Sequence, residues 1–208
     1  MQRSRARLAG IMAGVLGVLV IAGAIVYRVF QPAEVVTTAR GAYPTPDIAP
    51  TGVIGTLSAA PLIVDGRLRV YATTRQVRAE EPVHADTRST PYWSYRRWPA
   101  QLSGLLAVDR TVVSRWSDGQ LVALDAATGR VTWRADGPRP EAGYEGRVTG
   151  ASTVYAPAGL LRAAASGGRT VLIVSGPADV RGLDLRTGRE LWRATVDGSC
   201  RSAAFTTA

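Results

Sequence analysis

Side chains suited to catalysis are few and scattered in this sequence of 208 residues. It contains one histidine, His84, and one cysteine, Cys200. A serine hydrolase needs an imidazole base beside its nucleophile, yet the sequence has no Gly-x-Ser-x-Gly elbow. Walker, Gly-x-Gly-x-x-Gly, His-Glu-x-x-His and EF-hand patterns are absent as well. We therefore predict that the residues present provide no catalytic, cofactor-binding or metal-binding site, and that the protein is not an enzyme.

The single cysteine excludes an internal disulfide and any metal site built from several cysteines. Two interpretations of Cys200 stay open. Its disulfide partner lies outside this sequence, or it is a buried structural thiol.

All 25 basic residues are arginines, and the formal net charge is +9. Four of these arginines, three within residues 3–7 and Arg28, flank an apolar stretch near the N-terminus. That leaves 21 arginines against 16 acidic residues, a difference of +5, over the rest of the chain. Because this charge is diffuse rather than clustered, we expect no nucleic-acid partner.

Two aspartates, Asp125 and Asp184, occupy equivalent places in an internal repeat. Residues Arg110–Ala135 align without a gap on Arg169–Ala194, at an offset of 59, with 11 identities in 26 positions. The two carboxylates could in principle bind a metal ion or act as acid and base. Their identical place, between a β-prone run and a Thr-Gly pair, favours a structural role, because a carboxylate there accepts hydrogen bonds from turn amides.

The residues shared by the two copies form the pattern Ala-x-Asp-x-x-Thr-Gly-x-x-x-Trp, with Gly182 in place of the alanine in the second copy. This pattern resembles the repeats of the quinoprotein-type (PQQ-like) β-propeller proteins. The resemblance implies an all-β fold of four-stranded antiparallel blades, in which each tryptophan docks onto the adjacent blade. The predicted structural motif residues are Asp125, Thr128, Gly129 and Trp133 in the first copy, and Asp184, Thr187, Gly188 and Trp192 in the second.

The same resemblance bears on cofactors. Quinoprotein dehydrogenases of this fold bind pyrroloquinoline quinone through a Ca²⁺ site with asparagine and acidic ligands, often over a disulfide between adjacent cysteines. This sequence has no asparagine and one cysteine, so we expect no cofactor. Other members are membrane-tethered binding or assembly propellers, and that class fits this sequence better.

A degenerate repeat is predicted upstream, from about Gly55 to Trp98. Asp65-Gly66 and Asp118-Gly119 both stand between β-prone runs, which is a strong hairpin signal. The upstream unit lacks the Asp-x-x-Thr-Gly turn. In its place, Gln76–Pro91 is predicted to be a charged loop. We favour a loop that is merely exposed to solvent over one that belongs to a binding face. The aromatic run after this loop offers possible ligand contacts at Tyr92, Trp93 and Trp98.

The number of repeats is low for a propeller. Residues 52–208 supply about three blades, whereas propellers typically have four to eight. Arg201–Ala208 resembles the opening strand of a further blade. We therefore expect this sequence to be the N-terminal part of a longer protein.

An uncharged apolar stretch runs from Leu8 to Tyr27. A helix of this length, at about 1.5 Å per residue, spans roughly 30 Å, the thickness of the hydrocarbon core. A cleaved signal peptide has an apolar core of about 7 to 15 residues, although Ala22-Gly23-Ala24 could be a cleavage site. We favour an uncleaved single-pass anchor in the lipid bilayer. The preceding arginines predict a cytoplasmic N-terminus and an extracytoplasmic C-terminal domain at the plasma membrane.

The sequence thus predicts four regions: a cytoplasmic N-terminus (1–7), a transmembrane helix (8–30), a Pro-rich linker (31–51) and the propeller repeats (52–208). The linker carries four prolines and no sustained hydrophobic period, which is typical of an extended tether.

The predicted function is that of a noncatalytic binding or scaffold module, which is tethered to the membrane and binds a protein or another cell-envelope ligand. The alternative is the N-terminal part of a PQQ-dependent quinoprotein oxidoreductase whose cofactor residues lie beyond this sequence. A sensor is a third hypothesis. It would have to signal through a partner, because too few residues precede the helix for a cytoplasmic output domain.

Overall fold

The computed structural model describes residues 14, 16–18, 20, 22–23, 33–46, 61–81, 90–138 and 161–196. The chain divides into two compact units, Met1–Ala33 and Glu34–Ala208. In the first unit, the described residues between 14 and 23 are helical and exposed, and the rest of the predicted anchor, Leu8–Tyr27, lies outside the described residues. Within the part of the chain that is described, no helix is long and apolar enough to cross a bilayer. Membrane insertion stays a prediction from the sequence.

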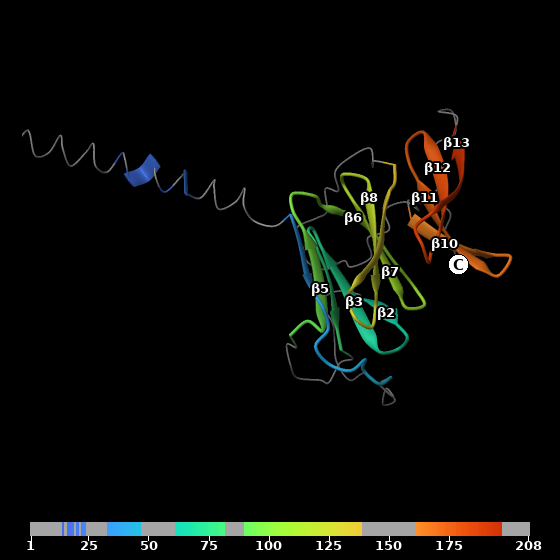
Figure 1. Ribbon diagram of the computed structural model, residues 1–208, viewed down its shortest axis with the longest axis horizontal. Coiled ribbons are helices and arrows are strands. Elements are labelled where there is room, and N and C mark those ends of the chain that lie inside the picture. Colours follow the sequence, from blue (N-terminus) through green and yellow to red (C-terminus); the bar gives the residue numbers. More distant parts are fainter. Residues whose placement is uncertain are drawn as a thin grey trace, which may run out of the picture. The chain divides into compact units, whose positions relative to one another are not determined.

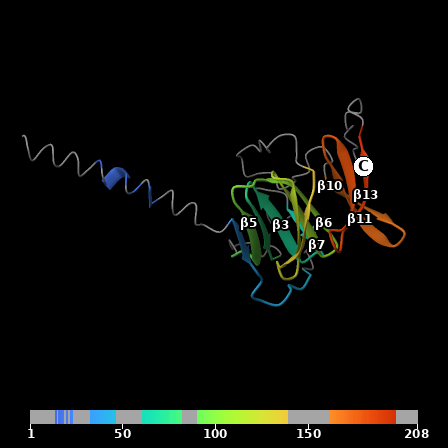
Figure 2. The same ribbon diagram turned by 45° about the horizontal axis from the view of Figure 1, so that its top comes forward.

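The second unit is all-β, and its described strands form three antiparallel sheets (Figures 1 and 2). Sheet 1 has the order β1-β5-β4-β3-β2, whereas sheets 2 and 3 are four-stranded meanders, β6 to β9 and β10 to β13. The structure confirms the predicted all-β fold and the antiparallel four-stranded units.

Sheet 1 comprises β1 (Glu34–Thr37), β2 (Leu62–Val64), β3 (Leu68–Thr73), β4 (Gln76–Glu80) and β5 (Trp93–Arg97). Sheet 2 comprises β6 (Leu102–Val108), β7 (Thr111–Trp116), β8 (Gln120–Asp125) and β9 (Val131–Asp136). Sheet 3 comprises β10 (Leu161–Ser166), β11 (Arg169–Ser175), β12 (Asp179–Asp184) and β13 (Glu190–Thr195).

Sheet 2 is buried on both faces because it packs between the other two sheets. Successive side chains of a strand point to opposite faces. In β8, Val122 and Leu124 accordingly join a core cluster with sheet 1, whereas Leu121 and Ala123 join a second cluster with sheet 3. A strand that is buried on both faces needs a continuous apolar run instead of an alternating one, and Leu121–Leu124 is such a run.

Both predicted Asp-Gly turns lie between paired antiparallel strands. Asp65 and Gly66 have positive φ angles of 53° and 64° and connect β2 to β3. Gly119, with a φ of 90°, precedes β8, and its amide donates to the carbonyl oxygen of Trp116 at 2.8 Å.

The gapless alignment of the two repeats differs from the structure by one residue along one strand. Strands β12 and β13 correspond to β8 and β9 at the offset of 59, but Thr111 pairs with Asp125 whereas Val171 pairs with Asp184. Strand β11 therefore corresponds to β7 at an offset of 60. The cause is the next turn: five residues, 116–120, lie between the last paired residues Arg115 and Leu121, whereas only four, 176–179, lie between Ser175 and Val180.

The segment predicted as a tether, residues 31–51, is in part a strand of sheet 1. Strand β1 pairs antiparallel with β5, with Val36 opposite Tyr95. Glu34 forms an ion pair with Arg134 of sheet 2, and the amide of Ala39 donates to the carbonyl oxygen of Thr128 at 2.9 Å. The β-prone sequence Glu-Val-Val-Thr explains this pairing, since it meets a free outer edge of the sheet.

The predicted charged loop, Gln76–Pro91, is wrong over its first five residues, which form β4. The sequence Gln-Val-Arg-Ala-Glu alternates polar and apolar residues, and Val77 and Ala79 are fully buried. This alternation is the period of a strand with one buried face. The remainder of the loop, including His84, lies outside the described residues except for Glu81, Thr90 and Pro91.

Candidate functional site

The repeated aspartates lie at the turns between the third and fourth strands of sheets 2 and 3. Asp125 Oδ1 accepts hydrogen bonds from the amide and the hydroxyl of Thr128, at 2.9 and 2.8 Å. Asp184 Oδ1 accepts the same pair from Thr187, both at 3.0 Å. The hydrogen bond from the Thr187 hydroxyl is the main cause of the lowered pKa of Asp184. Its carboxylate therefore stays ionised at neutral pH, and its contribution to stability is lost only as the pH falls through that lowered pKa.

Each turn receives a tryptophan from the preceding sheet. Trp93 of β5 donates its indole N–H to the carbonyl oxygen of Ala126, in sheet 2, at 2.7 Å. Trp133 of β9 donates in the same way to Leu185, in sheet 3, at 2.8 Å. In both cases the acceptor is the residue that follows the turn aspartate. One type of contact thus joins sheet 1 to sheet 2 and sheet 2 to sheet 3.

The turn glycines allow this close approach. Gly129 and Gly188 have positive φ angles of 69° and 71°. A Cβ at Gly129 would lie 2.5 Å from the Cβ of Trp93, and one at Gly188 would lie 2.5 Å from the ring of Trp133. Glycine is therefore needed at both positions for two reasons. It adopts the positive φ angle without strain, and it leaves the space that the tryptophan occupies.

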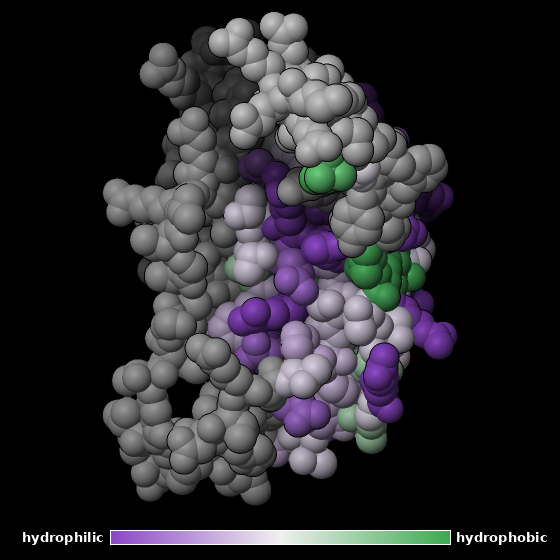
Figure 3. All heavy atoms as spheres, turned by 90° about the vertical axis from the view of Figure 1, so that its left-hand side faces the viewer, coloured by the Kyte–Doolittle hydropathy of each residue, from purple (hydrophilic) through white to green (hydrophobic). Residues whose placement is uncertain are grey.

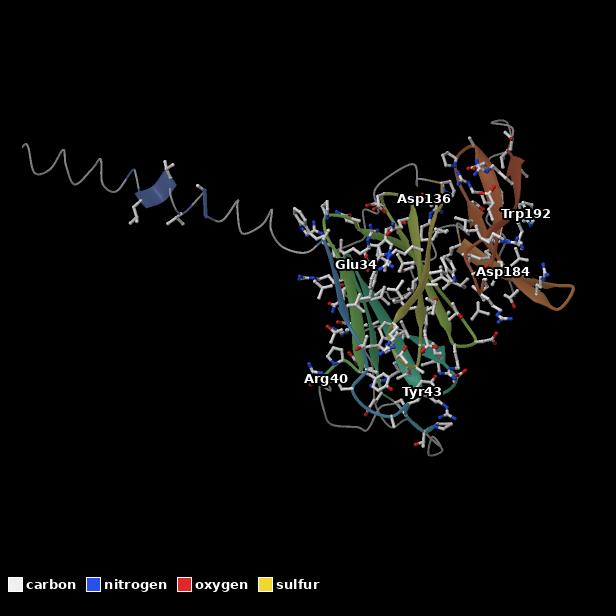
Figure 4. The ribbon with its side chains drawn as sticks, in the orientation of Figure 1. Glu34, Arg40, Tyr43, Asp136, Asp184 and Trp192 are labelled. Carbon is white, nitrogen blue, oxygen red and sulfur yellow. The ribbon has the colours of Figure 1, made fainter. Side chains whose placement is uncertain are left out.

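The third tryptophan of the series, Trp192 of β13, has no such partner turn among the described residues. It is 42% exposed, compared with 0% for Trp93 and 8% for Trp133. Figure 4 shows it on sheet 3.

The three aromatic residues predicted as ligand contacts have different surroundings. Trp93 is fully buried in the contact just described, and Tyr92 is 9% exposed, with its hydroxyl donating to the carbonyl oxygen of Ala127 at 3.0 Å. Trp98 is 39% exposed. Sheet 1 therefore has the same tryptophan contact as sheet 2 although it lacks the Asp-x-x-Thr-Gly turn, and only Trp98 is accessible to a ligand.

Figure 3 shows the described residues coloured by hydropathy, and hydrophilic residues make up most of those that are visible in this view. Arg97 forms a bidentate pair with Asp118, at 3.1 and 2.8 Å, and its guanidinium lies 5.3 Å from the ring centroid of Trp116. These contacts hold the chain immediately before Trp98, so Trp98 is presented from a fixed position.

A buried arginine, Arg115 of β7, was not predicted from the sequence. Its side chain is fully buried, and its two terminal nitrogens donate to the carbonyl oxygens of Ser175 at 2.8 Å and Pro138 at 2.7 Å. Burial lowers the pKa of Arg115, although an arginine remains charged. The signal in the sequence is a charged residue inside the β-prone run Thr111–Trp116. Its contact with Ser175 on β11, which joins sheet 2 to sheet 3, is seen only in the structure.

The segment after β1 also contacts the hairpin turns of sheets 1 and 2. The hydroxyl of Tyr43 donates to Asp65 Oδ2 at 3.0 Å, and the guanidinium groups of Arg67 and Arg110 each lie 5.1 Å from the centroid of its ring. Burial, together with the hydrogen bond to Asp65, raises the pKa of Tyr43 to about 12. This phenol is thus neutral and serves as a structural contact.

The described residues do not fit a Ca²⁺-bound quinone. In the described ranges, no three side chains of histidine, cysteine, aspartate or glutamate gather where they could hold a metal ion. The carboxylates of Glu34, Glu80 and Asp118 are engaged by arginines, and those of Asp125 and Asp184 cap turns. Cys200 lies outside the described residues.

Fold and contacts together define a class of protein: an all-β repeat protein whose four-stranded units are joined by tryptophans docked on the turns of the next unit. The sequence matches the family described as outer membrane protein assembly factor BamB over residues 44–135 and 82–207. These two matches cover more than half of the chain. The chain therefore belongs to this family of PQQ-like repeat proteins.

Several solved structures resemble parts of the chain. BamB from Moraxella catarrhalis is 15% identical, with 65% of this chain and 37% of that chain covered at a TM-score of 0.43. Quinohemoprotein alcohol dehydrogenase from Comamonas testosteroni is 18% identical, with 78% and 23% covered at a TM-score of 0.41. A europium-containing methanol dehydrogenase is 20% identical, with 64% and 24% covered at a TM-score of 0.38. No curated protein matches the sequence. The chain spans 37% or less of the length of these three structures.

Proposed function

We propose that the protein is a noncatalytic scaffold, anchored in the plasma membrane, whose extracytoplasmic repeats bind a protein of the cell envelope. The observation that carries this proposal is the structural role of the side chains that are repeated in the two copies of the motif. The repeated aspartates, threonines and glycines form turns, and Trp133 joins one sheet to the next. The residues that define the repeat therefore stabilise sheets that offer a binding surface, and they do not form a reaction centre.

Membership of a family described by an outer membrane protein assembly factor supports the same proposal. A protein of that description acts by binding other proteins, and rigid sheets with exposed aromatic residues suit this role. We propose Trp98 as a contact residue, because it is the one accessible member of the predicted aromatic trio.

The proposed anchor is Leu8–Tyr27, with the N-terminus in the cytoplasm. Since β1 begins at Glu34, residues 31–33 alone separate the predicted helix (8–30) from sheet 1. At about 3.3 to 3.6 Å per residue, three residues span roughly 10 Å. The proposed tether is therefore far shorter than the predicted linker of residues 31–51.

The anchor leads to a fractionation prediction. The full chain is expected to stay with the membranes after extraction at alkaline pH, because about twenty apolar residues are stable in the hydrocarbon core. A variant with Leu16→Arg and Val20→Arg is expected to move to the supernatant, since an arginine at the centre of a helix costs about 2.5 to 3.5 kcal/mol of insertion free energy. Release of the unaltered chain would contradict the anchor.

The partner surface leads to a crosslinking prediction. A photoreactive phenylalanine analogue in place of Trp98 is expected to give a discrete crosslinked product in intact membranes. The same analogue in place of Ile63, which is 61% exposed on β2, serves as the matched control and is expected to give none. Mass spectrometry of the product should identify an envelope protein.

Two outcomes would contradict the scaffold proposal. One is the same yield of products from positions 98 and 63, because Trp98 would then be no preferred contact. The other is dye reduction by the protein after reconstitution with pyrroloquinoline quinone and Ca²⁺. That result would favour the quinoprotein oxidoreductase.

A further inference from the structure

Two exposed arginines, Arg75 and Arg96, lie beside the exposed tryptophan of sheet 1, Trp98. Arg96 stands on β5 two residues before Trp98, and it pairs with Gln76 on β4. Arg75 belongs to the turn between β3 and β4, and its carbonyl oxygen accepts a hydrogen bond from the amide of Arg97 at 3.1 Å. The three residues therefore lie together at one end of sheet 1, which we call the Trp98 end.

The positive charges of these two arginines are not neutralised within the described part of the chain. There, neither Arg75 nor Arg96 forms an ion pair with a carboxylate. Their neighbour Arg97 differs, because its two terminal nitrogens donate to the carboxylate of Asp118. The Trp98 end thus combines an accessible aromatic side chain with two guanidinium groups that can take up carboxylates from outside the described residues.

The backbone of the Trp98 end is held in place by its neighbours. The ion pair with Asp118 fixes Arg97, and the carbonyl oxygen of Thr74, next to Arg75, accepts a hydrogen bond from the amide of Leu102 at 2.8 Å. A surface that is already ordered loses little conformational entropy when a partner binds. Tryptophan and arginine are also enriched among the residues that contribute most to the binding free energy of protein interfaces.

We propose that the Trp98 end binds an acidic surface of the envelope protein, in which Arg75 and Arg96 each pair with a carboxylate while Trp98 makes the apolar contact. The inference rests on the proposed function, in which Trp98 is a contact residue, and it adds the chemistry of the partner. A guanidinium group matches a carboxylate in geometry, because the two can form a pair of parallel hydrogen bonds. Charges at the rim of an interface also steer association of the two proteins.

Anionic lipid headgroups are another source of negative charge, but the distribution of charge at the Trp98 end favours a protein. The carboxylates of Glu34 and Asp118 are partly exposed at the same end, with 27% and 43% of their side chains accessible. A bilayer surface would bring its phosphates against these carboxylates as well as against the two arginines, and like charges repel. A protein surface can place its own carboxylates opposite Arg75 and Arg96 alone.

Arginine modification by phenylglyoxal tests the proposal on the full chain. Mass spectrometry compares the modification rates of Arg75 and Arg96 in native membranes, in nanodiscs of neutral lipid and in nanodiscs of anionic lipid. Both arginines are expected to react several-fold more slowly in native membranes than in either kind of nanodisc, because only native membranes contain the partner. Arg40 and Arg130 are the matched controls, and their rates are expected to be the same in all three samples.

The control arginines are exposed and lie far along β1 from the Trp98 end. Figure 4 shows Arg40 beyond the end of β1 that is opposite to Glu34. A variant with Arg75→Glu and Arg96→Glu is expected to lower the yield of the crosslinked product from position 98 about tenfold, because each reversal replaces an attraction by a repulsion. A variant with Arg40→Glu and Arg130→Glu has the same net charge and is expected to keep the yield.

Three results would overturn the proposal. Equal rates for Arg75 and Arg96 in native membranes and in neutral nanodiscs would show that no partner covers them. Slower modification in anionic nanodiscs, as in native membranes, would assign the Trp98 end to lipid headgroups. Equal yields from the two charge-reversed variants would show that the position of the arginines does not matter. A complete absence of product from position 98 would instead contradict the proposed function, and the modification rates would still decide whether the bound surface is that of a partner.

Discussion

Replacement of Trp133 by alanine is expected to lower the free energy of unfolding by about 4 kcal/mol, the range of buried Trp→Ala changes. Trp133 is 8% exposed and belongs to the core cluster between sheets 2 and 3. The substitution removes its packing and leaves the carbonyl oxygen of Leu185 without the indole donor. Urea denaturation of the full chain in detergent, followed by circular dichroism, measures the change. For a chain of this size the melting temperature should fall by about 10 °C.

Trp192→Ala is the matched control for this prediction. Trp192 has the same place in the repeat, but it is 42% exposed and the described residues offer it no acceptor turn. Its removal is therefore expected to cost about 1 kcal/mol or less. Equal losses for Trp133→Ala and Trp192→Ala would contradict the assignment of the inter-sheet contact to Trp133.

The repeat architecture could be predicted because its signal is local. The Asp-x-x-Thr-Gly turn and the tryptophan four residues after its glycine fix a turn and the strand that follows it. Hydrogen bonds from Thr128 to Asp125 lie within four residues of chain. Local hydrogen bonds of this kind need no knowledge of the rest of the fold.

Long-range pairing could not be predicted in the same way. Strand β1 pairs with β5, some sixty residues away in the sequence, and the four prolines nearby favoured a tether. Nothing in the sequence Glu34–Thr37 identifies its partner, because an edge strand is specified by the free edge it meets.

The one-residue shift of β11 has a similar cause. Identities at Arg110, Thr111 and Val112 favour an offset of 59, whereas the connection between the paired residues of β11 and β12, residues 176–179, is one residue shorter than in sheet 2 and displaces β11 by one position. A shift of one residue exchanges the two faces of a strand. Strand pairing in space therefore places Leu172 in the core between sheets 2 and 3, and Ile173 on the opposite face of sheet 3, which points away from sheet 2.

The aromatic run illustrates what composition can and cannot indicate. Its richness in tyrosine and tryptophan suggested ligand contacts, yet Trp93 performs the same docking as Trp133. The acceptor turn lies on the following sheet, so the absence of an Asp-x-x-Thr-Gly turn in sheet 1 does not bear on the role of its own tryptophan. Because each tryptophan docks onto the turn of the following sheet, Trp93 belongs to the core, and Trp98 is the exposed member of the three.

Gly129→Ala is expected to destabilise the protein by about 3 kcal/mol, from two separate effects. A positive φ of 69° costs an alanine about 1 kcal/mol or more. The new Cβ would lie 2.5 Å from the Cβ of Trp93, and overpacking of this kind costs about 1 to 3 kcal/mol. Because the Cβ of Trp93 is fixed to the backbone of β5, no rotamer change relieves the contact, and sheets 1 and 2 must separate locally.

Gly66→Ala separates the two effects, since Gly66 has a similar φ of 64° but a Cβ added there would meet no atom within 4 Å. It is expected to cost only the backbone strain, about 1 kcal/mol. Urea midpoints of the two variants measure the difference. Hydroxyl-radical footprinting with mass spectrometry should show increased oxidation of Trp93 in Gly129→Ala alone. Equal midpoints, with Trp93 protected in both variants, would show that the turn yields to a Cβ and that the glycine is needed for its φ angle only. The difference between the two variants therefore measures how closely sheet 1 is held against the turn of sheet 2.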